Sequence, residues 1–227
     1  DITSYNANMV ANEVFIDSAT LRENVVSLAK NIGYLPRSRK SSCAVVSFFV
    51  DATDISPPPA TITLKKGPIV TSSSKFGGQS FVFSIPEDIT VPVFEGIASF
   101  DDIKIYEGML LTSNFTFTSR NPNQKFILPN SGIDTDLISV TVRGNEQSTS
   151  KVKYILQDNL LEIDSDSKIF FIQEIEGERY EVFFGDGVFG NTLEEGNFIT
   201  IDYISSNGDS ANAVSYTHLR AHETPCH

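Results

Sequence analysis

Histidine and cysteine, two side chains that bind zinc readily, gather at one end of this 227-residue sequence. All three histidines fall among the last ten residues, and Cys226 lies beside the final one. His218 and His222 are four residues apart, a spacing that would place both rings on one face of a helix. Against a zinc site, Cys226 adjoins His227 at the terminus, and Glu223 is the one nearby carboxylate that would orient a ligand. We therefore predict no metal site.

The segment that holds these histidines differs from the rest of the chain. Residues 1–214 contain no histidine. Residues 215–227 resemble a tail that recurs on conceptual translations of assembled environmental DNA, in which library sequence is fused to a shortened reading frame. We therefore expect 215–227 to be a non-native tail and leave it out of the fold. Because the chain starts at Asp1, we expect a piece of a longer protein.

Residues 1–214 offer few groups for catalysis. A serine or cysteine hydrolase needs an imidazole near its nucleophile, and this part of the chain has none. A glycosidase needs two carboxyl groups about 5–9.5 Å apart, and Glu174 and Glu181 lie on the two strands of one predicted hairpin. Both residues alternate with apolar ones, which is also the pattern of solvent-facing strand positions. We predict no catalytic residue, no enzymatic activity and no cofactor.

Two acidic loops and one glycine-rich loop suggest ligands of other kinds. The pairs Asp134/Asp136 and Asp164/Asp166 offer the oxygen ligands that calcium prefers, but neither continues into a twelve-residue calcium loop, and both fit solvated acidic turns. The glycine-rich loop contains Gly185, Asp186, Gly187 and Gly190. A phosphate loop would continue into a helix and usually a lysine. This one does neither, so we predict a tight turn after a strand.

Charge and composition exclude several classes of partner. The chain has 29 acidic and 17 basic residues, a net charge of −12, which would repel a nucleic-acid backbone or an anionic membrane surface. No apolar stretch approaches the roughly 18 residues needed to cross a bilayer. The 17 phenylalanines and 7 tyrosines can fill a core. Of the two cysteines, Cys43 is predicted to be a buried free thiol.

The N-terminal residues have the pattern of a helix. Thr20 and Glu23 form a capping box, and Gly33 is placed to end the helix. The apolar residues between them recur at helical spacing and form one stripe: Leu21, Val25, Leu28 and Ile32. This stripe would pack either on a partner helix or on the protein's own sheet. We predict a helical segment at 1–40.

From Ser41 onward the sequence changes to short runs of β-branched and aromatic residues with turn signals between them. The clearest element is a hairpin that joins 169–174 to 179–184 through a turn near Gly177. The predicted fold class is α+β, mainly β. An N-terminal helical segment precedes two successive antiparallel β-rich parts, at 41–130 and 131–214.

Four groups of segments, in order along the chain, carry a family resemblance. They are 8–13 with 21–25 and 32–38; Ile105-Tyr106-Glu107-Gly108; 123–130 with 132–135; and Tyr180-Glu181-Val182-Phe183-Phe184-Gly185-Asp186-Gly187-Val188-Phe189-Gly190. Together they resemble the baseplate wedge proteins of T-even-like tailed phages and, more broadly, the baseplate J-like family of contractile injection systems. The turn Gly185, Asp186, Gly187 and Gly190 belongs to this motif.

The resemblance implies a non-enzymatic structural subunit of a contractile-tail baseplate wedge. Such a subunit would form homo-oligomers, as a dimer within a ring, and would join other wedge subunits around the tail hub. It would reside in the virion, in the tail baseplate, after assembly in the host bacterial cytoplasm. Nucleic acid and membrane are not expected partners. Two alternatives stay open: a β-rich ligand- or carbohydrate-binding module of a tail fibre or adhesin, and a glycosidase that uses acidic pairs.

Overall fold

A computed structural model describes residues 18–19, 25, 38–71, 80–121, 124–157, 164–175 and 177–208. These residues form thirteen β-strands and one short 3-10 helix, η1 (Thr135–Leu137). The predicted α+β class with an N-terminal helical segment is therefore wrong, and the described fold is mainly β. The described strands and loops pack against one another in two hydrophobic cores, because alternating apolar side chains turn one face of each strand inward. Most of the predicted segment 1–40 lies outside the described residues, and 38–40 run into the first strand without regular structure.

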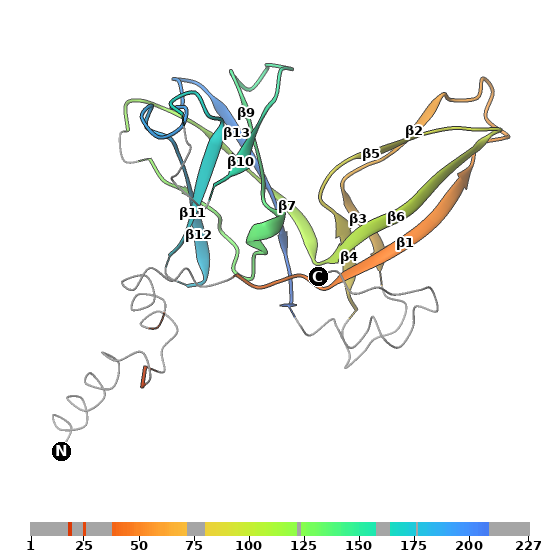
Figure 1. The fold of residues 1–227 in the computed structure, drawn as a ribbon, viewed down its shortest axis with the longest axis horizontal. Coiled ribbons are helices and arrows are strands. Elements are labelled where there is room, and N and C mark those ends of the chain that lie inside the picture. Colours follow the sequence, from red (N-terminus) through yellow and green to blue (C-terminus); the bar gives the residue numbers. More distant parts are fainter. Residues whose placement is uncertain are drawn as a thin grey trace.

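The first group of strands forms a four-stranded antiparallel sheet in the order β1-β6-β4-β3, together with a two-stranded ribbon, β2-β5 (Figure 1). Their bounds are β1 (Cys43–Asp51), β2 (Thr61–Leu64), β3 (Gly67–Thr71), β4 (Val82–Ile85), β5 (Ile89–Pro92) and β6 (Ile97–Glu107). The two longest, β1 and β6, pair along the whole of β1 and project as an arm. The ribbon packs on the same hydrophobic cluster as these strands.

The second group forms a seven-stranded sheet in the order β7-β13-β9-β10-β11-β12-β8. Its strands are β7 (Met109–Thr116), β8 (Phe126–Ile127), β9 (Ser139–Arg143), β10 (Val152–Leu156), β11 (Ile169–Ile175), β12 (Arg179–Phe184) and β13 (Phe198–Ser205). All neighbouring pairs are antiparallel except β10 and β11, which are parallel. Alternating apolar residues, such as Ile199, Ile201 and Tyr203 on β13, turn one face of each strand to the core.

This second sheet curls until its two edge strands, β7 and β8, approach each other. The rings of Phe115 on β7 and Phe126 on β8 lie 5.5 Å apart in an edge-to-face contact. Between the edges, the Gln124 side chain donates to the Thr116 carbonyl at 2.7 Å and accepts from the Thr118 backbone N–H at 3.0 Å. One amide side chain thus satisfies two backbone groups of an otherwise unpaired strand edge, and the sheet nearly closes.

Each sheet has its own hydrophobic core. Phe83, Ile85, Phe100 and Ile105 are almost fully buried in the first, while the second is filled from all seven strands and contains Tyr203. β7 and β8 fall within the predicted part 41–130 but pair in the second sheet, so sheet membership changes at Gly108. The division at 130/131 into separate parts stays a prediction. Among the described residues, no helix is long and apolar enough to cross a membrane.

Candidate functional site

The two sheets meet where β6 passes into β7 through Gly108. The Gly108 N–H donates to the Val82 carbonyl at 2.8 Å, and the Gly108 carbonyl accepts from the Ser84 hydroxyl at 2.8 Å. Its φ angle is +123°, and a Cβ at this position would lie 2.4 Å from the Ser205 carbonyl oxygen on β13. Glycine is therefore required here for two reasons, the backbone angle and the close approach of β13.

A buried carboxylate holds the same junction. Glu107 is 1% exposed, and its Oε2 accepts hydrogen bonds from the Ser206 hydroxyl at 2.7 Å and the Asn207 N–H at 3.1 Å. Its Oε1 accepts from the Asn207 side-chain amide at 3.0 Å. Because a buried charge is tolerated only when hydrogen-bonded, these donors account for the position of Glu107. They tie the end of β6 to the residues that follow β13.

Charged pairs join the sheets farther from this point. The Lys66 ammonium lies 2.5 Å from Oδ2 of Asp202, whose side chain is 8% exposed, and the Thr112 hydroxyl donates to Oδ1 of Asp202 at 2.6 Å. Lys153 on β10 pairs with Glu87, which precedes β5. Charged pairs thus connect the two sheets at these positions, whereas each core is apolar within itself.

The calcium candidate at Asp134 and Asp136 uses its carboxylates within the fold. Asp134 accepts the Ser41 N–H at 2.7 Å and the Asp136 N–H at 3.2 Å, and so caps η1. Asp136 pairs with Lys40 at 3.0 Å. Both bind the segment that leads into β1 to the second sheet. The described residues contain no group of three or more His, Cys, Asp or Glu side chains placed to hold a metal ion.

The two candidate glycosidase carboxylates lie on opposite faces of their hairpin. In the pairing of β11 with β12, Glu174 is opposite Tyr180, whereas Glu181 is opposite Gln173. Tyr180 is buried in the core of the curled sheet, so Glu174 is on the inner face and Glu181 on the outer one. Glu181 also pairs with Lys125 at 3.5 Å. These two groups cannot flank one glycosidic bond from these positions.

The family-motif turn follows β12 and is built by its own backbone. The Asp186 Oδ1 accepts the N–H groups of Val188 and Phe189, both at 2.9 Å, and the Gly187 N–H donates to the Gly190 carbonyl at 3.0 Å. A Cβ at Gly185 would lie 2.3 Å from the Gly190 carbonyl carbon, so the loop ends pack backbone to backbone. The amides that a phosphate would need are directed to Asp186 instead.

Asp186 gives this turn a testable pH dependence. Hydrogen bonds from the Phe189 and then the Val188 N–H lower the pKa of the Asp186 carboxyl below its ordinary value of 3.8. The folded pKa is the lower one, so the stabilisation is complete above pH 3.8 and is lost as the pH falls through the folded pKa.

We expect Asp186→Ala to lower the melting temperature at pH 7 and the difference from wild type to shrink below about pH 4. Asp186→Asn keeps an acceptor oxygen without the charge, so its deficit at pH 7 should be smaller than that of Asp186→Ala. This deficit should shrink over the same pH range, because it is the wild-type carboxylate that titrates. Melting curves from pH 7 to about pH 2.5 measure both variants. A constant Asp186→Ala deficit would contradict this assignment.

Other predicted positions fall outside the described residues. In the helical stripe, Leu21, Leu28 and Ile32 do so, and only Val25 is described. The tail positions do so as well: His218, His222, Cys226 and His227. The free thiol predicted at Cys43 is wrong, because this cysteine is disulfide-bonded and the described residues include no free cysteine.

Sequence reasoning missed Glu107 as a structural residue. Ile103, Ile105 and Glu107 occupy every second position of β6, and all three are buried. The sequence does contain a signal for this: Glu107 continues the alternation of inward-facing apolar residues, so a buried position could have been predicted for it. Glu107 and Gly108 also lie in one of the segments that carry the family resemblance, as does Gly132, whose carbonyl accepts the Ser206 N–H at 2.9 Å.

Apolar side chains also gather on two surfaces of the molecule, one at the end of the arm and one on the seven-stranded sheet. The arm tip, defined as Phe49, Ile55, Phe94 and Ile97, has exposed fractions from 42% to 76%. The outer patch, defined as the exposed Ile155 and Phe183 with the half-buried Phe171, lies on the outer face of β10, β11 and β12. The rings of Phe171 and Phe183 stack there at 5.3 Å. Exposed apolar groups gathered in this way are typical of contact surfaces.

The described part of the chain is thus a mainly β scaffold of two sheets, each of which carries an apolar surface. No family model matches the chain. It is 25% identical over 242 residues to baseplate wedge protein gp6 of Enterobacteria phage T4, in an alignment covering 96% of this chain and 35% of that protein. The chain thus has a distant, wedge-like relationship to this relative and spans about a third of its length.

Proposed function

We propose that this chain is part of a structural subunit of a contractile-tail baseplate wedge. The observation that carries the proposal is the similarity to a baseplate wedge protein, which extends over 96% of this chain. The subunit assembles with copies of itself and with other wedge subunits into a ring around the tail hub. Its place is the tail baseplate of the virion, after assembly in the host bacterial cytoplasm, and its work involves no enzymatic reaction.

The fold is suited to such a role. Two separately packed cores connected by Glu107, by the Lys66–Asp202 pair and by the Lys153–Glu87 pair form a scaffold of fixed shape. Contact surfaces held on such a scaffold keep their relative orientation, which a closed ring requires.

Co-purification tests the proposal. The full-length gene product that contains this chain is co-expressed with each of the other tail proteins of the same genome and analysed by size-exclusion chromatography with light scattering. We expect a complex of defined stoichiometry with at least one of them. Separate elution from every tail protein would overturn the proposal.

The two alternatives give different results in companion assays. A carbohydrate-binding module would melt at a higher temperature in the presence of its saccharide, because a ligand that binds only the folded state stabilises it. A glycosidase would turn over a chromogenic glycoside and lose that activity on Glu174→Gln or Glu181→Gln. The wedge proposal predicts neither effect.

A further inference from the structure

We propose that the family-motif turn is a preformed apolar knob that inserts into an apolar groove with a basic rim on a different baseplate protein. The knob is defined as Val188 and Phe189, which are 67% and 49% exposed and belong to neither the arm tip nor the outer patch. This inference rests on the proposed function and deepens it by naming a surface that meets another wedge subunit and the chemistry of that partner.

The backbone that carries the knob is fixed before any partner binds. The Asp186 Oδ1 accepts the N–H groups of both knob residues at 2.9 Å. The Gly190 N–H donates to the Asp164 carbonyl at 3.2 Å, and a Cβ at Gly190 would lie 2.7 Å from Ile169 Cγ1, so the base of the turn packs directly on β11. Side chains held on a fixed backbone lose less conformational entropy on binding than side chains of a loose loop.

The knob lies at the end of the curled sheet that is opposite to the segment leading into β1. Glu178, directly before β12, pairs with Arg39 of that segment at 3.3 Å, whereas the turn follows the other end of β12. The residues after β13 return to the same segment, because the Ser42 hydroxyl donates to the Gly208 carbonyl at 3.4 Å. The described chain therefore enters and leaves the curled sheet at the end away from the knob.

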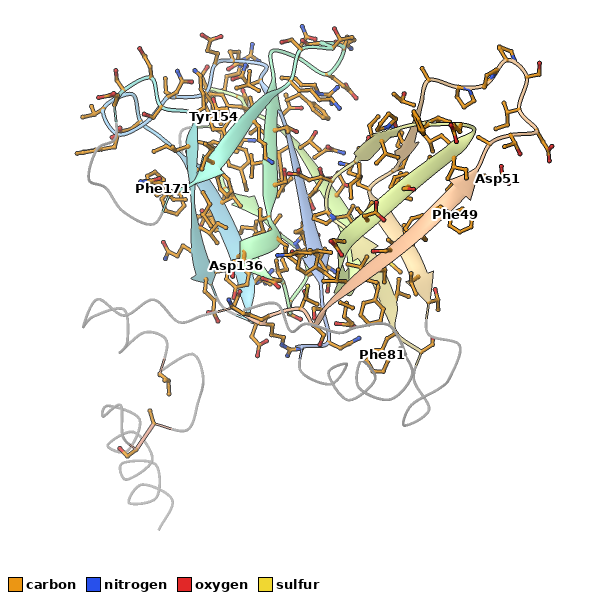
Figure 2. All side chains as sticks on the ribbon, turned by 45° about the vertical axis from the view of Figure 1, so that its right-hand side comes forward. Phe49, Asp51, Phe81, Asp136, Tyr154 and Phe171 are labelled. Carbon is orange, nitrogen blue, oxygen red and sulfur yellow. The ribbon has the colours of Figure 1, made fainter. Side chains whose placement is uncertain are left out.

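The side chains at the two ends of the sheet agree with this placement. Tyr154, whose hydroxyl donates to Asn191 directly after the turn at 3.2 Å, lies toward one end of the sheet in Figure 2. Asp136, which pairs with Lys40 of the segment leading into β1, lies at the other end. Since the chain passes in and out of the sheet at the end marked by Asp136, the knob is presented to a separate protein.

The loops that carry and support the knob are acidic. Segments 164–168 and 185–195 contain one basic residue, Lys168, and five acidic ones: Asp164, Asp166, Asp186, Glu194 and Glu195. Arg120 of a neighbouring loop acts electrostatically on Glu195, so five acidic residues face two basic ones. Lys153, on the strand beside Lys168, is paired with Glu87.

These features define the partner. Valine and phenylalanine side chains lose contact with water in an apolar groove, and acidic loops around them are complemented by lysine or arginine at its rim. A second copy is a poorer partner, because the whole chain has a net charge of −12. Two side chains make an anchor within a larger interface, of the kind whose truncation costs most of the affinity.

Variants of the full-length gene product that contains this chain test the inference. The knob variant is Val188→Thr/Phe189→Thr, which removes apolar area and keeps the turn residues Gly185, Asp186, Gly187 and Gly190. The matched control, Val70→Thr/Met109→Thr, changes two residues that are 38% and 51% exposed and lie on β3 and β7. Circular dichroism and melting curves check folding. If the knob variant does not fold, Val188→Thr alone replaces it.

Isothermal titration calorimetry against each tail protein that co-purifies with the wild type gives the readout. We expect the knob variant to bind at least one of them about tenfold more weakly or worse, with the control within about twofold of wild type. Asp186→Ala keeps both knob side chains but releases their backbone, so it should also bind more weakly. Raising NaCl to about 0.5 M should weaken wild-type binding, because exposed charges are screened.

Four other outcomes overturn the inference. If every complex forms as tightly with the knob variant as with the control, the inference is wrong and the proposed function stands. Wild-type binding that salt does not weaken overturns the basic rim, and wild-type affinity in Asp186→Ala overturns the preformed turn. A knob variant that loses only self-association indicates a second copy as the partner. Absence of any complex with a tail protein overturns the proposed function together with this inference.

Discussion

Replacing Gly108 by alanine should cost about 2 to 6 kcal/mol of folding free energy. An L-residue at a φ of +123° carries a backbone strain of about 1 to 3 kcal/mol. The added Cβ would also lie 2.4 Å from the Ser205 carbonyl oxygen and 2.6 Å from Ile204 Cγ2. Relief requires β13 to move away from β6, and overpacking of this kind adds about 1 to 3 kcal/mol. Denaturant unfolding measures the change.

Two other glycines separate these contributions. Gly67 has a similar φ of +127°, but a Cβ there would meet no atom within 4 Å, so Gly67→Ala should show the backbone strain alone. Gly144 lacks a positive φ and also has open space around it, so Gly144→Ala should be nearly neutral. If Gly108→Ala destabilises no more than Gly67→Ala, the tight contact between Gly108 and β13 is not present in solution.

Local alternation predicted the clearest hairpin correctly, because side chains of a half-buried strand alternate between faces wherever the strand pairs. The hairpin expected at 169–174 and 179–184 is β11 and β12. Strand β3 gives a weaker local signal, because it contains Gly67 and Pro68, two residues that are rare inside strands.

The local sequence pattern does not determine which strands pair with each other. β13 lies between β7 and β9, and β10 runs parallel to β11, arrangements that depend on contacts far apart in the sequence. The relative position of Glu174 and Glu181 depends on register in the same way. Glu181 is paired with Gln173, the neighbour of Glu174 along β11, so the two carboxylates are on opposite faces of the hairpin. The helical spacing from Leu21 to Ile32 is also a local signal, and of its four stripe residues only Val25 is among the described ones.

Removing the Glu107 carboxylate should destabilise the protein by about 3 to 5 kcal/mol. Glu107→Ala leaves the Ser206 hydroxyl and both Asn207 donors without their acceptor and opens space at a position that is 1% exposed. Each unsatisfied buried donor costs about 1 to 3 kcal/mol, and a water molecule that enters the space would recover part of that cost. Unfolding in denaturant measures the loss.

Glu107→Gln separates hydrogen bonding from volume. Glutamine fills the same space, but its amide group offers a donor where the carboxylate offered an acceptor, so one hydrogen bond at Ser206 or Asn207 is lost. We expect a cost of about 1 to 3 kcal/mol, between wild type and Glu107→Ala. Glu146→Ala, at an exposed position in a loop of the second sheet, is the control and should change stability by less than about 0.5 kcal/mol.

The position of Glu107 also predicts where the effect appears. Its acceptors fix residues 206 and 207, directly after β13, against the end of β6, so hydrogen exchange should quicken at Ser206 and Asn207 before it does within either core. Exchange that quickens evenly through both cores would instead mean that Glu107 supports the fold as a whole. A local effect would make this carboxylate the element that sets how the arm is held relative to the curled sheet, and the geometry of any assembly built on those two surfaces would depend on it.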